Sequence, residues 1–251
     1  GGVELKDRGF GTEKVEDDVK RIFPEVRVAR MDLDTTRTRT AYETIIADFQ
    51  AGRTDVLIGT QMVSKGLDFD RVSVVGILNA DSLLNYPDFR SYERAFQLMA
   101  QVAGRAGRKN RQGLVILQTK SPDLPLIHQV VTNDYRQMYT EQLEERRLFN
   151  YPPFDRLVYV YLKHRKEEVV DQAASVLAGW LRSGMGEWIL GPDKPPVGRI
   201  QQLFIKKIVV KIAQGTSMTK VRSYLLQLQH ALVEDERHLK SIPGASEELV
   251  R

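Results

Sequence analysis

Short apolar runs alternate with longer segments of helical periodicity through the first 120 residues of the chain. The apolar runs lie at residues 26–30, 55–59, 72–78 and 113–119. Between them, apolar side chains recur at helical spacing at about 12–22, 36–51 and 91–104. A run as continuously apolar as Val72–Leu78 is typical of a strand covered on both faces, and strands that alternate with helices favour a parallel sheet. The pattern therefore predicts an α/β domain with helices on both faces of a parallel sheet.

This alternation stops near residue 120, where Ser121, Pro122 and Pro125 interrupt the chain. Residues 126–148 have helical periodicity, and the run Asn150-Tyr151-Pro152-Pro153 is the clearest break in the sequence. We place a domain boundary there, between residues 1–150 and 151–251. The second segment predicts a smaller α+β domain, with one strand at 157–162, one or two at 200–212, and helices at 166–182 and 217–233.

Several polar residues are placed to begin helices or turns. Thr12 can cap the first helix, and Asp34, Thr35 or Thr36 can cap the second. Asp32 and Asp34 follow a short apolar run, and turn or cap chemistry explains them better than catalysis does.

The composition excludes several kinds of site. The chain has no cysteine, so disulfides and thiolate metal sites are impossible within it. The four histidines show no ligand-like spacing, and we expect no metal site. No apolar run approaches the roughly 20 residues that cross a bilayer, and the first ten residues do not resemble a signal peptide, so we expect a cytoplasmic protein. The sequence also lacks a GxxxxGK(S/T) loop and a following acidic pair, the usual means of holding ATP phosphates and magnesium.

Basic residues are concentrated late in the chain. Residues 1–150 hold 22 basic and 22 acidic side chains, whereas residues 194–233 hold seven Lys or Arg and no Asp or Glu. Such asymmetry favours a nucleic-acid surface, although a solvated basic helix and strand would show it too. The candidate nucleic-acid contacts in this segment are Arg199, Lys206, Lys207 and Lys211.

The run QVAGRAGR at residues 101–108 is the strongest local signal. If the helix before it continues, Gln101, Arg105 and Arg108 lie at i, i+4 and i+7 on one stripe. Each of Gly104 and Gly107 costs a helix interior about 1 kcal/mol, so close approach of another backbone or a phosphate is expected there. Paired arginines suit a phosphoryl group, but arginines that complement a helix C-terminus would have the same spacing.

A second polar segment follows the apolar run at 55–59. Thr60 and Gln61 can donate to a backbone phosphate, and Lys65 adds positive charge. Gly66 permits close approach, and Asp68 can accept from a ribose hydroxyl or orient an arginine. Strand ends in parallel sheets are common ligand sites, although a plain strand-to-helix connection is the alternative.

These segments resemble those of a known family. QVAGRAGR resembles motif VI of superfamily 2 helicases, and residues 58–69 resemble motif V. GFGTEKVE at 9–16 and RMDLDTT at 30–36 are similar to segments that open the second motor lobe of the PriA (primosomal protein N′) family of replication-restart helicases. The resemblance is continuous from about Gly9 to Thr119 and looser through Tyr151-Pro152-Pro153-Phe154. It implies a second RecA-like lobe followed by the family's C-terminal domain.

The resemblance also implies roles for the candidate residues. Arg108 would be the arginine finger, Arg105 a second γ-phosphate contact, and Gln101 a link between nucleotide and DNA. Thr60 and Gln61 would contact DNA, and Gly66 and Asp68 would face the nucleotide.

ATP and Mg²⁺ would be bound mainly by a first lobe that precedes residue 1, where the family's zinc module would also lie. The chain alone would then be inactive. The intact protein would translocate 3′ to 5′, recognise stalled or branched forks and assemble the primosome. Its partners would be DNA, single-strand DNA-binding protein and other primosome proteins, and it would be a monomer.

A non-catalytic module that binds DNA or a replication protein is the alternative. The acid-free basic segment at 194–233 motivates it. A GxxxxGK(S/T) loop encoded upstream in the natural gene would favour the helicase, and salt-insensitive binding would favour a protein partner.

Overall fold

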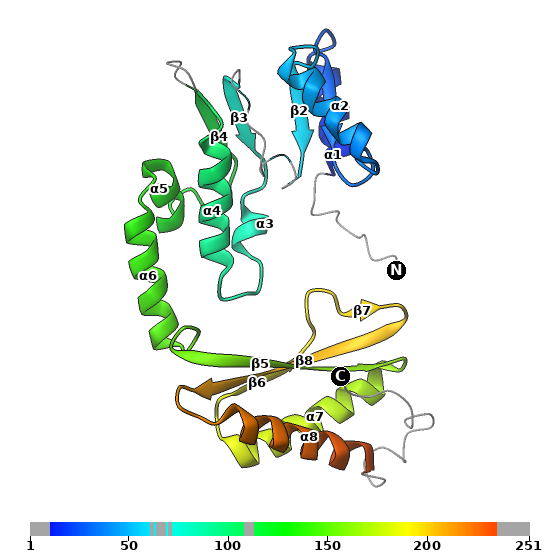
Figure 1. Cartoon of the computed structure of the whole chain (residues 1–251), viewed down its shortest axis with the longest axis vertical. Coiled ribbons are helices and arrows are strands. Elements are labelled where there is room, and N and C mark those ends of the chain that lie inside the picture. The colour runs from blue at the N-terminus through cyan, green and yellow to red at the C-terminus, as the bar shows by residue number, and fades with distance from the viewer. Residues whose placement is uncertain (1–10, 61–62, 64–68, 70–71, 108–112, 235–251) are drawn as a thin grey trace. The chain divides into compact units, whose positions relative to one another are not determined.

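A computed structural model describes residues 11–60, 63, 69, 72–107 and 113–234. The chain divides into two compact units, Gly1–Thr140 and Glu141–Arg251. The division falls within helix α6 (Tyr135–Leu148), shortly before the proline-rich break at which the sequence places the boundary. Figure 1 shows the elements of each unit.

The first unit begins with two helices and two strands. They are α1 (Thr12–Ile22), β1 (Val28–Met31), α2 (Arg39–Gln50) and β2 (Val56–Gly59). The strands pair in parallel, from Val28 opposite Val56 to Met31 opposite Gly59. Buried Met31 and Phe69 form the centre of an apolar cluster that α2 covers with Tyr42, Ile45, Ile46 and Phe49.

A second strand pair completes the first unit. The strands of this pair are β3 (Val74–Ile77) and β4 (Leu114–Leu117). The helices of this part are α3 (Asp81–Leu84), α4 (Ser91–Ala103), α5 (Pro125–Thr132) and the start of α6. Strands β3 and β4 are parallel, with Val74 opposite Leu114 and Ile77 opposite Leu117. Helices α4 and α5 bury Phe96, Met99 and Leu126 in a core that Ile77 and Leu117 adjoin.

The parallel pairing confirms the predicted α/β class, but two details of the prediction are wrong. Among the described residues, the strands form two separate two-stranded sheets rather than one. Strands β3 and β4 are not covered on both faces, since Val74, Leu114 and Ile116 are each more than half exposed. The helical cover from α4 and α5 reaches only their Ile77 and Leu117 ends. In addition, the single helix predicted at 126–148 is two helices, because Asn133 adopts a left-handed conformation at φ 53°.

The second unit is an antiparallel sheet with two helices. Its elements are β5 (Asp155–His164), α7 (Glu167–Met185), β6 (Ile189–Asp193), β7 (Arg199–Ile200), β8 (Leu203–Ala213) and α8 (Met218–Glu234). The strand order is β5-β8-β6, and β7 forms a hairpin with β8. Helices α7 and α8 lie on the same face of this sheet (Figure 1) and bury a core that includes Leu177, Leu181, Ile208 and Val210. The α+β prediction for this unit is confirmed.

Two further properties concern the described residues alone. None of the described helices is long and apolar enough to cross a membrane. Within the same residues, no three His, Asp or Glu side chains gather in a way that could hold a metal ion.

Candidate functional site

The parallel strands β1 and β2 end side by side, and their carboxyl ends form one edge of the sheet. Their last residues, Met31 and Gly59, are register partners, so Asp32 and Thr60 follow at the same carboxyl edge of the parallel pair. Thr60 is exposed, and its carbonyl accepts a hydrogen bond from the amide of Val63 at 3.1 Å. The sequence prediction that Thr60 stands at a strand tip is confirmed.

Position 59 requires glycine because the structure leaves no room there for a side chain. A Cβ at this position would lie 2.7 Å from the carbonyl oxygen of Met31 and would overlap the side chain of Val63. Gly59 therefore lies tightly against the end of β1 and the side chain of Val63, where a larger residue would not fit.

Two described residues of the segment that follows Thr60, Val63 and Phe69, contribute to the α2 core. Val63 packs on the cluster around Met31, and Phe69 is buried with its ring edge-on to Phe49, 4.8 Å between centroids. The other residues predicted to act in this segment lie outside the described residues: Gln61, Lys65, Gly66 and Asp68.

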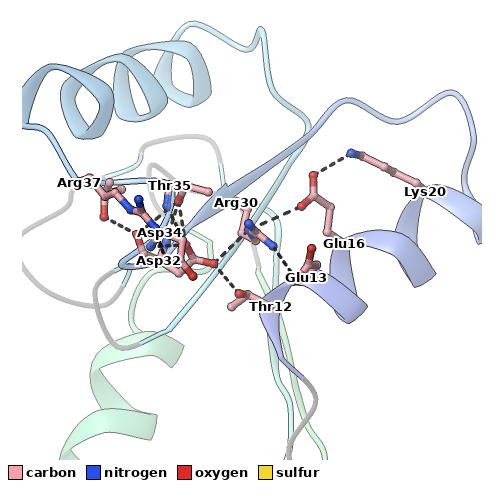
Figure 2. Close-up of polar contacts among 10 residues, drawn as sticks. Thr12, Glu13, Glu16, Lys20, Arg30, Asp32, Asp34, Thr35 and Arg37 are labelled. Carbon is pink, nitrogen blue, oxygen red and sulfur yellow. Dashed lines mark hydrogen bonds and ion pairs between the residues drawn. The ribbon is translucent and has the colours of Figure 1, made fainter.

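Asp32 organises the turn that leaves β1 (Figure 2). Its Oδ1 accepts hydrogen bonds from the amides of Asp34 and Thr35, both at 3.0 Å. Its Oδ2 accepts a hydrogen bond from the hydroxyl of Thr12 at 2.6 Å. These donors favour the charged carboxylate, and with Thr12 as the largest cause they lower the pKa of Asp32 to about 2. The prediction that Asp32 serves turn chemistry is confirmed.

Arg30 extends this network toward α1. Its Nε lies 3.0 Å from Oδ2 of Asp32 and 3.7 Å from a carboxylate oxygen of Glu16. A longer contact of 3.9 Å joins it to Glu13, and Glu16 also binds Lys20 at 2.7 Å. Figure 2 shows these side chains converging between α1 and the end of β1. The arginine is occupied by acidic partners, so the network fixes α1 to the strand edge and leaves Arg30 unsuited to an external anion.

Both predicted helix caps in this region are wrong. Helix α1 starts at Thr12, but the N-cap residue is Gly11 and no side chain caps it, because the Thr12 hydroxyl is directed to Asp32. Helix α2 is capped by Thr38, whose hydroxyl accepts from the amide of Ala41 at 3.2 Å. The predicted caps belong instead to the Asp32 turn, where the hydroxyl of Thr36 donates to the Asp32 carbonyl.

The arginine segment begins where α4 ends. The helix stops at Ala103, and the amides of Arg105 and Ala106 bond back to Val102 and Ala103, in the i to i−3 pattern of a tighter turn. Gly107 has a left-handed φ of 75°, which does not continue a helix, so the predicted continuous helical stripe to Arg108 is wrong. Gln101 is exposed on the last turn of α4, and Arg105 is half-buried. Arg108 lies outside the described residues.

The glycines of the arginine segment differ in whether the surrounding structure requires a residue without a side chain. Gly107 has φ 75°, and its amide donates to the carbonyl of Val72 at 3.1 Å, so close approach of another backbone is confirmed there. A Cβ on Gly104 would meet only ordinary contacts, the nearest at 3.4 Å, and nothing in the structure explains this glycine. Sequence reasoning missed Gly113, where a Cβ would lie 2.6 Å from that of Ala106 and overlap the Gly107 amide.

Another residue whose role the sequence did not suggest is Asp81, at the start of α3. Its carboxylate accepts from the hydroxyl of Thr119 at 2.9 Å and from the amide of Lys120 at 3.0 Å. These bonds lower the pKa of Asp81, with the Lys120 amide as the largest cause, and tie the end of β4 to α3.

In the second unit, two of the predicted nucleic-acid contacts are engaged internally. Lys211 is 9% exposed, and its ammonium donates to the carbonyl of Phe149 at 2.6 Å and lies 4.0 Å from the ring centroid of Tyr151. Burial lowers the pKa of Lys211. Lys206 forms an ion pair with Asp171 of α7 at 2.9 Å. These placements contradict the prediction that Lys211 is displayed to a ligand and weaken it for Lys206.

The other two predicted contacts are accessible. The ammonium of Lys207 lies 5.6 Å from the ring centroid of Tyr159, on the sheet face away from α7. The exposed guanidinium of Arg199 lies 4.7 Å from the ring centroid of Phe204 in the β7–β8 hairpin. The two glutamines at the hairpin tip, Gln201 and Gln202, have positive φ values of 48° and 65°.

Comparison with known proteins gives two family matches in the same order along the chain. The helicase conserved C-terminal domain family matches residues 11–110, and the primosomal protein N C-terminal domain family matches residues 147–242. The chain is 38% identical to the replication restart protein PriA of Bacillus subtilis over 93% of its length, and 41% identical to that of a Synechocystis species over 82%. It spans less than a third of these relatives, 29% and 25% of their lengths.

Proposed function

The chain belongs to the PriA family of replication restart proteins, and from this premise we propose that it forms the second motor lobe and C-terminal domain of an ATP-dependent 3′–5′ DNA helicase. The intact protein would act at stalled or branched forks and restart replication by assembling the primosome. The observation that carries this proposal is the similarity over nearly the whole chain, with a helicase domain followed by a primosomal domain.

On the nucleotide side, Arg105 and Arg108 would contact the γ-phosphate, and Gln101, Gly66 and Asp68 would lie near it. A guanidinium offers only donors, in a planar fork that suits phosphoryl oxygens, and the half-buried position of Arg105 would strengthen such contacts. When bound, Mg²⁺-ATP would supply the phosphoryl group whose hydrolysis drives motion. Most of the nucleotide would be held by a lobe outside residues 1–251, which contain no GxxxxGK(S/T) loop. The family's zinc would also be bound outside this chain.

On the DNA side, Thr60, Gln61 and Lys65 would hold backbone phosphates at the carboxyl edge of β1 and β2. Exposure of Thr60 beyond its strand supports this assignment, because a hydroxyl there can donate to phosphate without reading a base. In the second unit, Arg199 and Lys207 would bind DNA, with Lys206 in a weaker role. The other proposed partners are single-strand DNA-binding protein and primosome proteins, and the proposed protein is a cytoplasmic monomer.

The alternative is a module that binds DNA or a replication protein without taking part in ATP hydrolysis. The seven basic and no acidic residues at 194–233 favour it as a second candidate. It predicts that Arg105 and Arg108 are dispensable for any hydrolysis.

A chimera separates the two candidates. Residues 1–251 alone should hydrolyse no ATP, with or without single-stranded DNA. In the chimera, residues 1–251 replace the matched 236-residue region of the Bacillus subtilis relative. This chimera should hydrolyse ATP when DNA is added. Robust hydrolysis by the chain alone, or a folded chimera without hydrolysis, would contradict the proposal.

A further inference from the structure

One face of the second unit's sheet carries no described helix. Side chains alternate between the two faces of a strand, so Val158, Val160, Ile208 and Val210 face α7 and α8. The residues between them point the other way. Ile205 and Lys211 of β8 lie on this side too but are buried. We name the accessible part between them the open face, and it comprises Tyr159, Tyr161 and Lys163 of β5, Leu190 of β6, and Lys207 and Val209 of β8.

Two tyrosines give the open face an aromatic platform. Tyr159 and Tyr161 are two residues apart on β5, with ring centroids 6.4 Å apart and an angle of 38° between the rings. Tyr159 is 41% exposed, so part of its ring is accessible to a ligand. The apolar surface continues across the next two strands. Val209 of β8 is the register partner of Tyr159 on one side and of Leu190 of β6 on the other. A flat surface of this kind suits the faces of unstacked bases.

Two lysines flank the platform. Lys207 is the register partner of Tyr161, and its ammonium also lies 5.6 Å from the Tyr159 ring. Lys163 follows Tyr161 on the same face. Asp193 is opposite Lys207 on β6, yet neither lysine forms an ion pair with a carboxylate of the described chain. Both ammonium groups are therefore available to a polyanion, in contrast to the engaged Lys206 and Lys211.

We propose that the open face binds single-stranded DNA, with Tyr159 and Tyr161 stacked on successive bases and Lys163 and Lys207 on the adjoining phosphates. This inference rests on the proposed function, in which the protein acts on DNA, and it assigns the strand-binding surface of the second unit. Single strands fit better than duplex, because a duplex keeps its bases stacked on one another and offers none to an external ring. An antiparallel sheet with helices on one face and aromatic rings on the other is a known arrangement for binding single strands.

The test is fluorescence anisotropy of a labelled oligothymidylate with the full 251-residue chain. Tyr159→Ala and Tyr161→Ala should each weaken binding roughly 5- to 100-fold, the range expected for a lost stacked base, whereas the Phe variants should bind nearly as the parent does. Tyr86→Ala removes a tyrosine that is 51% exposed in the first unit and should have no effect. Circular dichroism and a melting curve check that each variant is folded.

The lysines provide a matched pair of variants. Lys207→Ala should weaken binding and reduce the slope of log affinity against log salt by about 0.7, one phosphate contact on a single strand. Lys20→Ala removes an exposed lysine of α1 that pairs with Glu16 and should leave the slope unchanged. An oligonucleotide carrying 5-iodouracil should cross-link to the peptide that contains residues 155–164.

The outcomes separate this inference from the proposed function. Binding that is unchanged in folded Tyr159→Ala and Tyr161→Ala variants, or cross-links elsewhere, overturns the open-face assignment. Absence of single-strand binding by the parent chain overturns it as well. Neither result touches ATP hydrolysis by the chimera, which decides the proposed function independently. Preferential binding of a protein partner, with no DNA bound, would reassign the surface.

Discussion

The hydroxyl of Thr12 lies 2.6 Å from the carboxylate of Asp32 and donates a hydrogen bond to it across 20 positions of the sequence. This bond joins the first residue of α1 to the turn at the end of β1, where the candidate DNA edge begins (Figure 2). Arg30 reinforces the junction, because its guanidinium meets the same carboxylate and Glu16 of α1. The geometry of this edge therefore depends on contacts between segments that are distant in sequence.

Thr12→Val should destabilise the first unit. Valine keeps the shape but cannot donate to Asp32, so the free energy of unfolding should fall by about 1 kcal/mol. Urea unfolding followed by circular dichroism measures the change. Thr44→Val is the control, since the exposed Thr44 hydroxyl bonds to the Thr40 carbonyl within its own helix, and its effect should be smaller. Equal midpoints for Thr12→Val and the parent would show that the bond contributes nothing.

Acid should reveal the contribution of Asp32. Its native pKa of about 2 is below the unfolded value of about 3.9, so the stabilisation is fully present above pH ~4 and is lost as the pH falls through about 2. Asp32→Asn should lower stability at pH 7 and flatten the dependence of unfolding free energy on pH between about 4 and 2. Other carboxylates titrate in both proteins, so the difference isolates Asp32. Parallel pH profiles would contradict the assigned pKa.

The glycines of the arginine segment should respond differently to alanine. Gly107→Ala places a Cβ on a residue with φ 75° and should cost about 1–2 kcal/mol. Gly104→Ala meets only ordinary contacts in a right-handed conformation and should be neutral or stabilising. Thermal melting of the two variants tests the ranking. If Gly104→Ala is stable but blocks hydrolysis in the chimera, this glycine is kept for function.

Replacing Lys211 should mainly lower the stability of the second unit, whereas replacing Lys207 should mainly lower the affinity for DNA. Lys211→Ala removes the donor to the Phe149 carbonyl and should destabilise the second unit by about 1–3 kcal/mol with little direct effect on DNA affinity. Lys207→Ala should do the reverse. Melting curves and oligonucleotide titrations on the same samples provide the comparison, and a loss of DNA affinity in a folded Lys211→Ala protein at low temperature would restore this lysine to the binding surface.

Periodicity predicted most elements because it reports which side chains are buried. The helix at Thr12–Ile22 has the predicted bounds, and the strand and helix patterns of the second unit are confirmed with small shifts at their ends. Alternation along β8 also places Lys206 and Lys207 on opposite faces of the sheet, although their neighbouring positions and shared charge make them look alike in the sequence.

The errors arose where a side chain's partner is distant in sequence. The hydroxyl of Thr12 could cap its own helix or reach Asp32, and only the fold selects the second. Lys211 has the residue type of a DNA ligand, but the carbonyl that holds it belongs to Phe149, 62 positions away. Gly113 is needed because Ala106 and Gly107 lie against it, a contact that no local pattern reveals.

The most direct test of the central claim is DNA-stimulated ATP hydrolysis by the chimera with Arg105→Ala. Hydrolysis should fall by about 10³-fold or more, while single-stranded DNA binding and the melting temperature stay close to those of the parent chimera. Arg108→Ala should behave in the same way, and Arg21→Ala, an exposed arginine of α1, should change nothing. Undiminished hydrolysis in a folded Arg105→Ala chimera, or an equal loss of DNA binding, would contradict the motor assignment.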